Sequence, residues 1–212
     1  LTTNRLFRDV SAWYHIVLSV DTTQATASNR VKIYVNGVQE TSFSTETQPS
    51  QNYDMEWNKN SQTIEIGKYL FQSGYSQFDG SMTHFHFIDG TSYDASTFGE
   101  TDSTSGIWKP KTAPSVTYGN NGFFLKMENS GAMGTDSSGN SNTFTVSGTL
   151  TQNVDTPSNN FATLNNLNAM NQPTLTNGNN TLSVGSNNWK ISPSTLAPSS
   201  GKWYVEHKVS AN

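Results

Sequence analysis

The chain of 212 residues is long enough to bury a substantial core, but only 13% of its residues are charged, 33% are hydrophobic, and its formal net charge is −4. This balance excludes the clustered Lys and Arg of a nucleic-acid groove, and no apolar run is long enough to span a bilayer. We therefore expect neither nucleic-acid binding nor membrane insertion. The absence of Cys excludes disulfides and thiolate metal sites.

The first two strand candidates are separated by a polar stretch. Residues 12–21 (AWYHIVLSVD) are almost continuously apolar, which is typical of a central strand covered on both faces. The following RVKIYVNGVQETSF alternates, so we expect Val31, Ile33 and Val35 to face the core. Asn36-Gly37 supplies the two positive-φ residues that a type I′ hairpin requires.

The rest of the first 150 residues also predicts short strands rather than helices. Residues 45–60 have no period and are expected to form a loop, whereas 94–100 (DASTFGE) can form one helical turn capped by Asp94 or Ser96. No segment keeps a helical period for three turns, so the sequence predicts an all-β, antiparallel sandwich. Further strands are expected at residues 62–70, 80–90, 121–129 and 142–148.

From about Asp155 the sequence becomes rich in Asn, with too few apolar residues to build a core of its own. Such a stretch is typical of a linker or of an irregular wrap across neighbouring domains. Phe161, Leu164, Leu167 and Met170 indicate that it is ordered against another surface.

Both ends of the chain lie in strand-like sequence. At the C-terminal end, Trp203 and Val205 alternate with Tyr204 and Glu206, a pattern that begins as the chain ends. We therefore expect the chain to be an interior part of a longer polypeptide.

Several motifs follow one another in a fixed order from residue 7 to residue 142. They are FRDVSAWYHIVLSVDTTQATASNRVKIYVNGVQ, FDGSMTHFHFIDG, FGETD, GIWKPK and GTDSSGNSN. Together they resemble a laminin-G-like, concanavalin-A-type domain found in tailed-bacteriophage and marine viral proteins. Later, VDTPSNNFATLN leads to SSGKWYVEHKV, which resembles the first strand of a SPRY domain.

This resemblance implies a jelly-roll β-sandwich over residues 1–150 that is incomplete at its N-terminus. It also implies an Asn-rich connector over 151–198 and the start of a SPRY-like sandwich over 199–212. A structural or host-contacting virion protein of the tail or fibre region is implied, located in the virion or outside the cell. The markers FGETD and WKPK have no chemical role that the sequence alone explains.

A glucanase of this sandwich fold would carry a motif resembling E-x-D-x-E on one strand, with nucleophile and acid on the same face. Here Asp54 and Glu56 lie in an expected loop, a third carboxylate is missing and Glu65 stands alone. No G-x-S-x-G motif occurs either. We expect a non-enzymatic protein; a carbohydrate-active enzyme or its accessory carbohydrate-binding domain is the alternative.

Two kinds of metal site are conceivable. His84 and His86 form an H-x-H pair on one strand face, but a third ligand is not evident, and packing beside Met82 and Ile88 is the favoured interpretation. Calcium, which laminin-G-like domains often carry, needs oxygen ligands such as those of Asp79, Asp89 and the turn DSSGN at 136–140. Such residues usually cap their own backbone, so no cofactor is expected, with Ca²⁺ as the alternative.

A glycan site is the remaining candidate, because sugars stack on aromatic rings and bond to planar amides. The loop at 53–60 and the stretch at 69–79 supply these groups, whereas Trp13, Trp108 and Trp203 are expected in the core. The candidate glycan-binding residues are Tyr53, Trp57, Asn58, Tyr69 and Tyr75. Expected partners are further copies of the chain or other virion proteins, and cell-surface carbohydrate.

Overall fold

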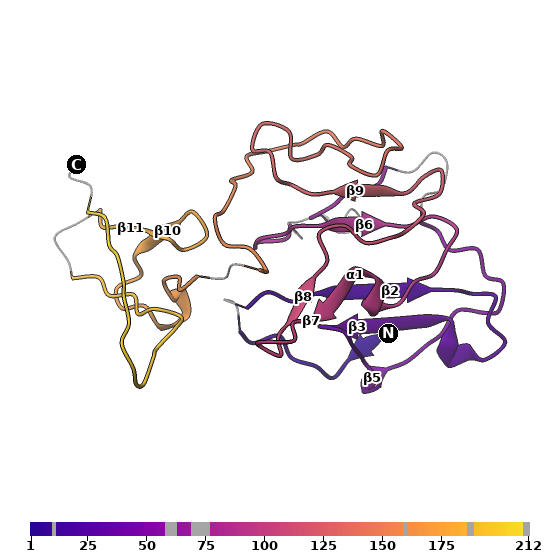
Figure 1. The fold of residues 1–212 in the computed structure, drawn as a ribbon, viewed down its shortest axis with the longest axis horizontal. Helices are drawn as coiled ribbons and strands as arrows, with labels where there is room; N and C mark the ends of the chain where they lie inside the picture. The colour runs from indigo at the N-terminus through magenta and orange to yellow at the C-terminus, as the bar shows by residue number, and fades with distance from the viewer. Residues whose placement is uncertain (10–11, 58–62, 69–76, 159–160, 186–188, 210–212) are drawn as a thin grey trace. The chain divides into compact units, whose positions relative to one another are not determined.

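The computed structural model describes residues 1–9, 12–57, 63–68, 77–158, 161–185 and 189–209 (Figure 1). It divides into two compact units, Leu1–Asn160 and Phe161–Asn212, which are treated separately below. Strand makes up 23% of the chain and helix 5%, which confirms the predicted all-β composition. In the described residues, no helix has the length and apolar character that crossing a bilayer requires.

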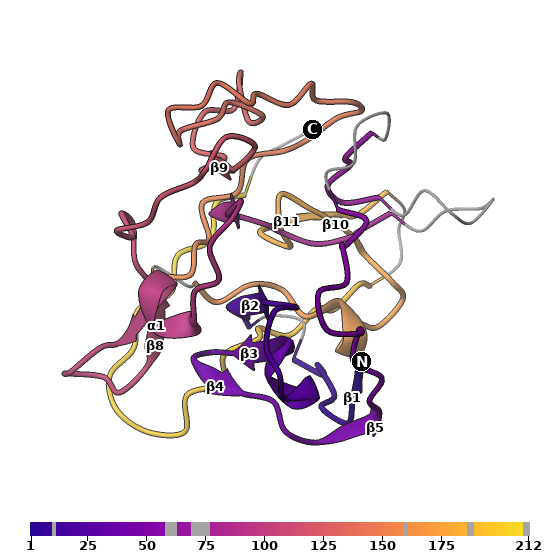
Figure 2. The same cartoon turned by 90° about the vertical axis from the view of Figure 1, so that its right-hand side faces the viewer.

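The predicted hairpin forms the central sheet of the first unit, in the strand order β2-β3-β4. The strands are β2 (Ile16–Val20), β3 (Val31–Val35) and β4 (Val38–Gln39), and Figures 1 and 2 both show β2 and β3 side by side. Asn36 and Gly37 link β3 to β4 with φ of 48° and 80°. The type I′ turn chemistry expected from these two residues is confirmed.

The central sheet has two different faces. Val17 pairs with Tyr34, and both side chains pack into a cluster with Ala95 and Phe98. Ile16 pairs with Val35 on the other face.

The expectation of a strand covered on both faces is wrong for β2, because Ile16 is 51% and Leu18 48% exposed. Of the three β3 residues expected in the core, Val35 is 3% exposed, whereas Val31 and Ile33 are only half-buried. Alternation along β3 separated the two faces correctly. It gave no role to Tyr34, whose ring packs against the cluster of Val17, Ala95 and Phe98.

A second pair of strands includes one strand that is buried along its whole length. The strands β6 (Phe85–Phe87) and β9 (Phe123–Leu125) pair antiparallel, and all of β9 is buried. Phe144 packs edge-on against Phe123 at 4.7 Å between ring centroids. Strands were therefore correctly predicted within 80–90 and 121–129, although each is shorter than expected.

A short helix leads into a two-stranded ribbon. Helix α1 (Ala95–Phe98) is preceded by its N-cap residue, Asp94. The Asp94 side chain accepts a hydrogen bond from the Ser96 backbone N–H, which confirms the predicted cap. The ribbon consists of β7 (Gly99–Thr101) and β8 (Trp108–Pro110). Two further short strands, β1 (Thr2–Thr3) and β5 (Phe43–Thr45), pair near the start of the chain.

Two predicted strands are wrong where the structure describes them. Residues 63–68 contain only an isolated bridge from Lys68 to Gln77, and residues 142–148 form no strand. At Phe144 the backbone N–H donates to Gly134 instead of to a neighbouring strand. Apolar alternation alone is insufficient because a strand also needs a partner for its backbone groups.

The second unit is more ordered than a linker. It contains the hairpin of β10 (Thr174–Thr176) and β11 (Thr181–Ser183), joined through residues 177–180. The strand expected from Trp203 onward is wrong over the described residues 202–209, and Trp203, expected in the core, is 73% exposed. Leu167 and Met170 are also largely exposed, so the expected docking of this segment is not seen within its own unit.

Candidate functional site

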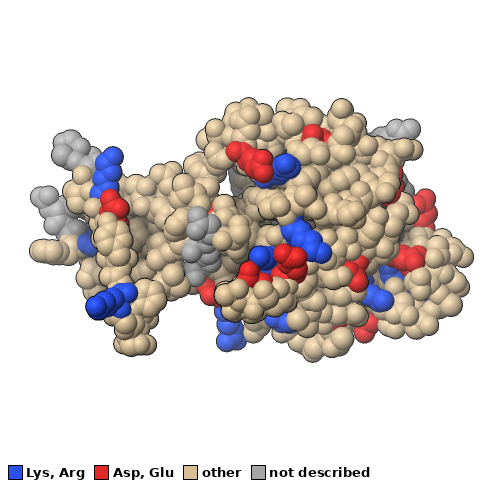
Figure 3. All heavy atoms as spheres, in the orientation of Figure 1, with Lys and Arg blue, Asp and Glu red and all other residues tan. Residues whose placement is uncertain are grey.

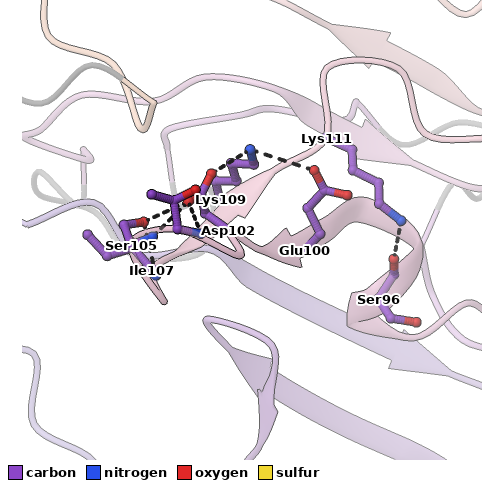
Figure 4. A network of polar contacts seen from close by, with 8 residues as sticks. Ser96, Glu100, Asp102, Ser105, Ile107, Lys109 and Lys111 are labelled. Atoms are coloured by element: carbon purple, nitrogen blue, oxygen red, sulfur yellow. Dashed lines mark hydrogen bonds and ion pairs between the residues drawn. The ribbon is translucent and has the colours of Figure 1, made fainter.

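The two marker motifs form one structure, because FGETD contributes β7 and WKPK contributes β8. Their register pairs Glu100 with Lys109 and Thr101 with Trp108. Lys109 Nζ donates to Asp102 Oδ2 at 2.9 Å and lies 3.8 Å from Glu100 Oε1 (Figure 4). The acidic and basic residues of the two motifs therefore neutralise each other across the ribbon.

Asp102 organises the loop between the two strands. Its Oδ1 accepts a hydrogen bond from the backbone N–H of Ser105 at 2.9 Å (Figure 4). The same oxygen accepts a second bond from the backbone N–H of Thr104 at 3.0 Å. The Ser105 hydrogen bond and the bond from Lys109 hold the Asp102 pKa well below its usual range, and the pairing raises the pKa of Lys109. Lys111 donates to the Ser96 carbonyl at 2.7 Å and so ties the ribbon to α1.

Trp108 joins this ribbon to the central hairpin. Its ring lies so close to Gly37 and Gly99 that a Cβ at either glycine would overlap it. The indole Nε1 donates to His15 Nδ1 at 3.0 Å. Burial lowers the pKa of His15, which keeps the ring neutral and able to accept this bond. The expectation that Trp108 packs in the core is supported by its place beside the Val17 cluster.

The histidine pair belongs to an aromatic stack. His86 lies against Phe124 with 3.9 Å between ring centroids, and His86 Nδ1 is 2.8 Å from the Tyr118 hydroxyl. Burial, with smaller contributions from His84 and His15, lowers the His86 pKa to about 4. Burial raises the pKa of Tyr118 to about 12.

His84 is likewise neutral, because burial lowers its pKa, and its Nδ1 lies 2.9 Å from Thr83 Oγ1. The interpretation of the pair as packed rather than metal-binding is supported by its ring neighbours, which include Phe124 for both histidines and Tyr118 for His86. Among the described residues, no group of three His, Cys, Asp or Glu is placed to hold a metal ion.

The carboxylates considered for calcium bind backbone and side-chain N–H groups. Asp136 accepts from the backbone of Phe124, Ser138 and Asn142 at 2.8–2.9 Å. Burial acts to raise the Asp136 pKa, but these hydrogen bonds outweigh it and lower the pKa. Asp89 Oδ2 accepts from the backbone and side-chain nitrogens of Asn121 at 3.1 and 2.9 Å. Asp136 therefore caps the local turn of Ser138 and Asn142, as expected, but it also binds Phe124 in β9, and Asp89 binds Asn121, which lies 32 residues away in the sequence. The third candidate, Asp79, is exposed.

The candidate glycan residues are only partly placed. Tyr53 and Trp57 lie in the expected loop and are 47% and 50% exposed, without a ring contact to each other in the described part of the chain. Asn58, Tyr69 and Tyr75 lie outside the described residues. Of the five predicted glycan-binding residues, the structure therefore describes two, Tyr53 and Trp57, and the rings of both are exposed.

The carboxylates of the enzyme hypothesis, Asp54 and Glu56, lie in the same loop and are exposed. Because the segment is not a strand, their two-residue spacing does not place them on one face. Trp13, expected in the core, is half-buried and donates from Nε1 to Asp155 Oδ2 at 2.9 Å.

Sequence reasoning missed the contact of Trp108 with Gly37 and Gly99. The type I′ turn is a sufficient reason for a glycine at position 37, so the sequence pattern gave no sign that the Trp108 ring also requires one there. The markers G-E-T and W-K-P could have been paired from their opposite charges and similar lengths.

Comparison with protein-family models, with curated proteins and with solved structures gave no match for this chain.

Proposed function

We propose that this chain is a non-enzymatic structural and adhesion module of a phage virion, from its tail or fibre region. In this proposal neighbouring subunits cover its apolar surface, while its loops contact host-surface glycan. The laminin-G-like resemblance of residues 7–142 suggests the class of protein. The observation that carries the proposal is the amount of surface that the chain leaves exposed.

The accessible surface of the chain is 15391 Å². A folded monomer of 23.2 kDa is expected to expose about 9,700 Å². Two separate folded bodies with the sizes of the two units would still expose only about 11,400 Å². The total therefore exceeds that of two compact bodies, and part of it belongs to residues outside those that the structure describes.

Large apolar side chains contribute to this excess in both units. Ile16, Leu18 and Val38 are exposed in the first unit, and Trp189 is 87% exposed in the second. An isolated globular protein rarely leaves so many large apolar groups in water, whereas interfaces bury them. On the face drawn in Figure 3, acidic and basic side chains are interspersed among uncharged ones. This surface is suited to polar contacts between proteins rather than to binding a polyanion.

The finer architecture is part of the proposal. We place β2-β3-β4 and β6-β9 in a laminin-G-like jelly roll. In the same proposal, the second unit is a connector that leads into a SPRY-like sandwich.

The adhesive role is assigned to Tyr53 and Trp57, whose half-exposed rings can stack on sugar faces. We expect the protein to bind one class of bacterial surface polysaccharide on a glycan array and Trp57→Ala to weaken this binding at least tenfold. Trp189→Ala is the matched control, because it removes an exposed Trp outside the candidate loop. Equal effects of the two substitutions would contradict the assignment.

The alternative, a carbohydrate-active enzyme or accessory domain, makes an opposite prediction. Incubation with the bound polysaccharide should release reducing sugar, and Asp54→Asn or Glu56→Gln should abolish this release. We expect no release from the unsubstituted protein. Turnover that depends on either carboxylate would replace the adhesion proposal with a glycosidase.

A further inference from the structure

The loop that carries Tyr53 is tied to the polar stretch at 21–30, which connects β2 to β3. The Asn52 backbone N–H donates to the Thr22 carbonyl at 2.8 Å. Next to it, Gln51 Nε2 donates to the Thr23 carbonyl at 3.0 Å. Because Tyr53 directly follows Asn52, these two bonds fix the backbone from which its half-exposed ring projects.

Arg30, the last residue before β3, joins the loop to the polar stretch from the other side. Its guanidinium donates to three backbone carbonyls, each at 2.9 Å: Nε to Gln24, Nη2 to Ala25 and Nη1 to Pro49. The first two acceptors belong to the polar stretch and the third belongs to the loop. A guanidinium is planar and directs its donors in fixed directions, whereas the ammonium group of Lys is a compact point charge. Lys at this position could not hold all three carbonyls.

The loop forms a defined turn at this point. The Tyr53 N–H donates to the Ser50 carbonyl at 3.2 Å, and Asn52 has a φ of 58°, in the left-handed region that Asn adopts more readily than most residues. The turn and its ties order the backbone beside the aromatic ring in the absence of a ligand. A binding group that is ordered beforehand lowers the entropic cost of binding.

The charge of the loop indicates which class of glycan the Tyr53 ring can accept. Residues 45–60 contain Glu46, Asp54 and Glu56 against Lys59, which gives a formal charge of −2. An acidic polysaccharide would be repelled by this charge, whereas a neutral sugar needs only an aromatic face and polar groups. The loop is therefore suited to a neutral polysaccharide.

We propose that Arg30 is a positioning residue, which holds the loop so that the Tyr53 ring can stack on a neutral polysaccharide. This inference rests on the proposed function for the binding of glycan. It adds the residue that orients the site and the class of sugar that the site takes. Without the Arg30 bonds, the polysaccharide would have to order the loop as it binds, so its affinity would fall although Arg30 does not touch it.

The first experiment tests the tie without any glycan. Arg30→Lys keeps the charge but loses the planar set of donors. Hydrogen exchange of the Asn52 amide should become at least tenfold faster, while the Glu40 amide, which donates to Ile33 in the central sheet, should exchange at an unchanged rate. Arg5→Lys is the matched control, because the Arg5 guanidinium binds the Glu40 side chain, and it should leave exchange at Asn52 unchanged.

The second experiment measures binding by affinity electrophoresis in gels that contain neutral homopolymers of glucose, mannose or galactose, with alginate as the acidic probe. At least one neutral polymer should bind more tightly than alginate. Arg30→Lys should weaken this binding about tenfold and Arg5→Lys less than twofold. In a Tyr53→Ala background, where Trp57 still supports binding, Arg30→Lys should cost less than twofold, because the ring that it positions is gone.

The outcomes separate this inference from the proposed function. An unchanged exchange rate at Asn52, or an equal effect of Arg30→Lys with and without Tyr53, overturns the positioning role and leaves the proposed function standing. Binding to acidic polymers alone overturns the class of sugar. A protein that binds no polysaccharide, on the array or in the gels, overturns the adhesive role itself and this inference with it, even if exchange at Asn52 shows that the tie exists.

Discussion

Replacing Gly99 by Ala should destabilise the first unit through Trp108. A Cβ at position 99 would lie 2.5 Å from Trp108 Cζ2, whereas ordinary carbon contacts are 3.4–4 Å. The ring must therefore move by about 1 Å, but its Nε1 is bonded to His15 at 3.0 Å. Overpacking of this kind costs about 1–3 kcal/mol, and weakening the His15 bond adds up to about 1 kcal/mol.

We expect Gly99→Ala to lower the free energy of unfolding by about 2 kcal/mol and Tm by roughly 4–8 °C. The free energy is measured by urea unfolding followed by circular dichroism and Tm by thermal unfolding, with Gly131→Ala as the control. The nearest atom to a Cβ at 131 is the Asn129 side chain at 3.5 Å, so this control should be neutral or stabilising by up to about 1 kcal/mol.

The cause can be separated from a general loss of flexibility with a double-mutant cycle. Trp108→Phe removes the part of the ring that would meet the new methyl group, so Gly99→Ala should cost about 1 kcal/mol less in that background. The proposed packing is refuted if Gly99→Ala costs no more than Gly131→Ala. It is also refuted if the cost is the same with Phe at position 108.

Two predictions concern pH, and one concerns the turn of the central hairpin. Because the folded pKa of His86 is about 4, below its unfolded value, stability is complete above about pH 6.5 and falls by up to roughly 3 kcal/mol as the pH drops to 4. His86→Phe should flatten this decline in urea unfolding measured across that range. The depressed pKa of Asp102 contributes stability above about pH 4 that is lost in more acidic solution, so Asp102→Asn should reduce the acid sensitivity below about pH 4. Gly37→Ala should cost more than Gly99→Ala in thermal unfolding, because position 37 combines the Trp108 contact with a φ of +80°.

Local chemistry explains which elements could be predicted from the sequence. Asn36-Gly37 and the Asp94 cap act within a few residues of themselves, and both appear as expected. The β10-β11 hairpin carried a related signal, since the four turn-forming residues NGNN at 177–180 separate the matching sequences TLT and TLS. The Asn-rich composition around it conceals that signal, because such composition is also typical of a linker.

Long-range partners explain what could not be predicted. The sequence around 142–148 alternates like a strand, but Phe144 bonds to Gly134 and packs on Phe123 instead. The pairing of Trp108 with His15 joins residues 93 positions apart, for which a single sequence carries no signal. Of the candidate glycan residues, the sequence located Tyr53 and Trp57 correctly in an exposed loop, because charged and amide neighbours rarely occur around a core aromatic.

The central claim is that other polypeptide covers the surface that this chain leaves exposed. The most direct test is the molar mass of the purified chain by light scattering over a range of concentration of about a hundredfold. We expect at least twice the monomer mass of 23.2 kDa at micromolar concentration, with dissociation on dilution. A folded species that stays at 23.2 kDa throughout, with the compact hydrodynamic radius of a single globule, would contradict the claim.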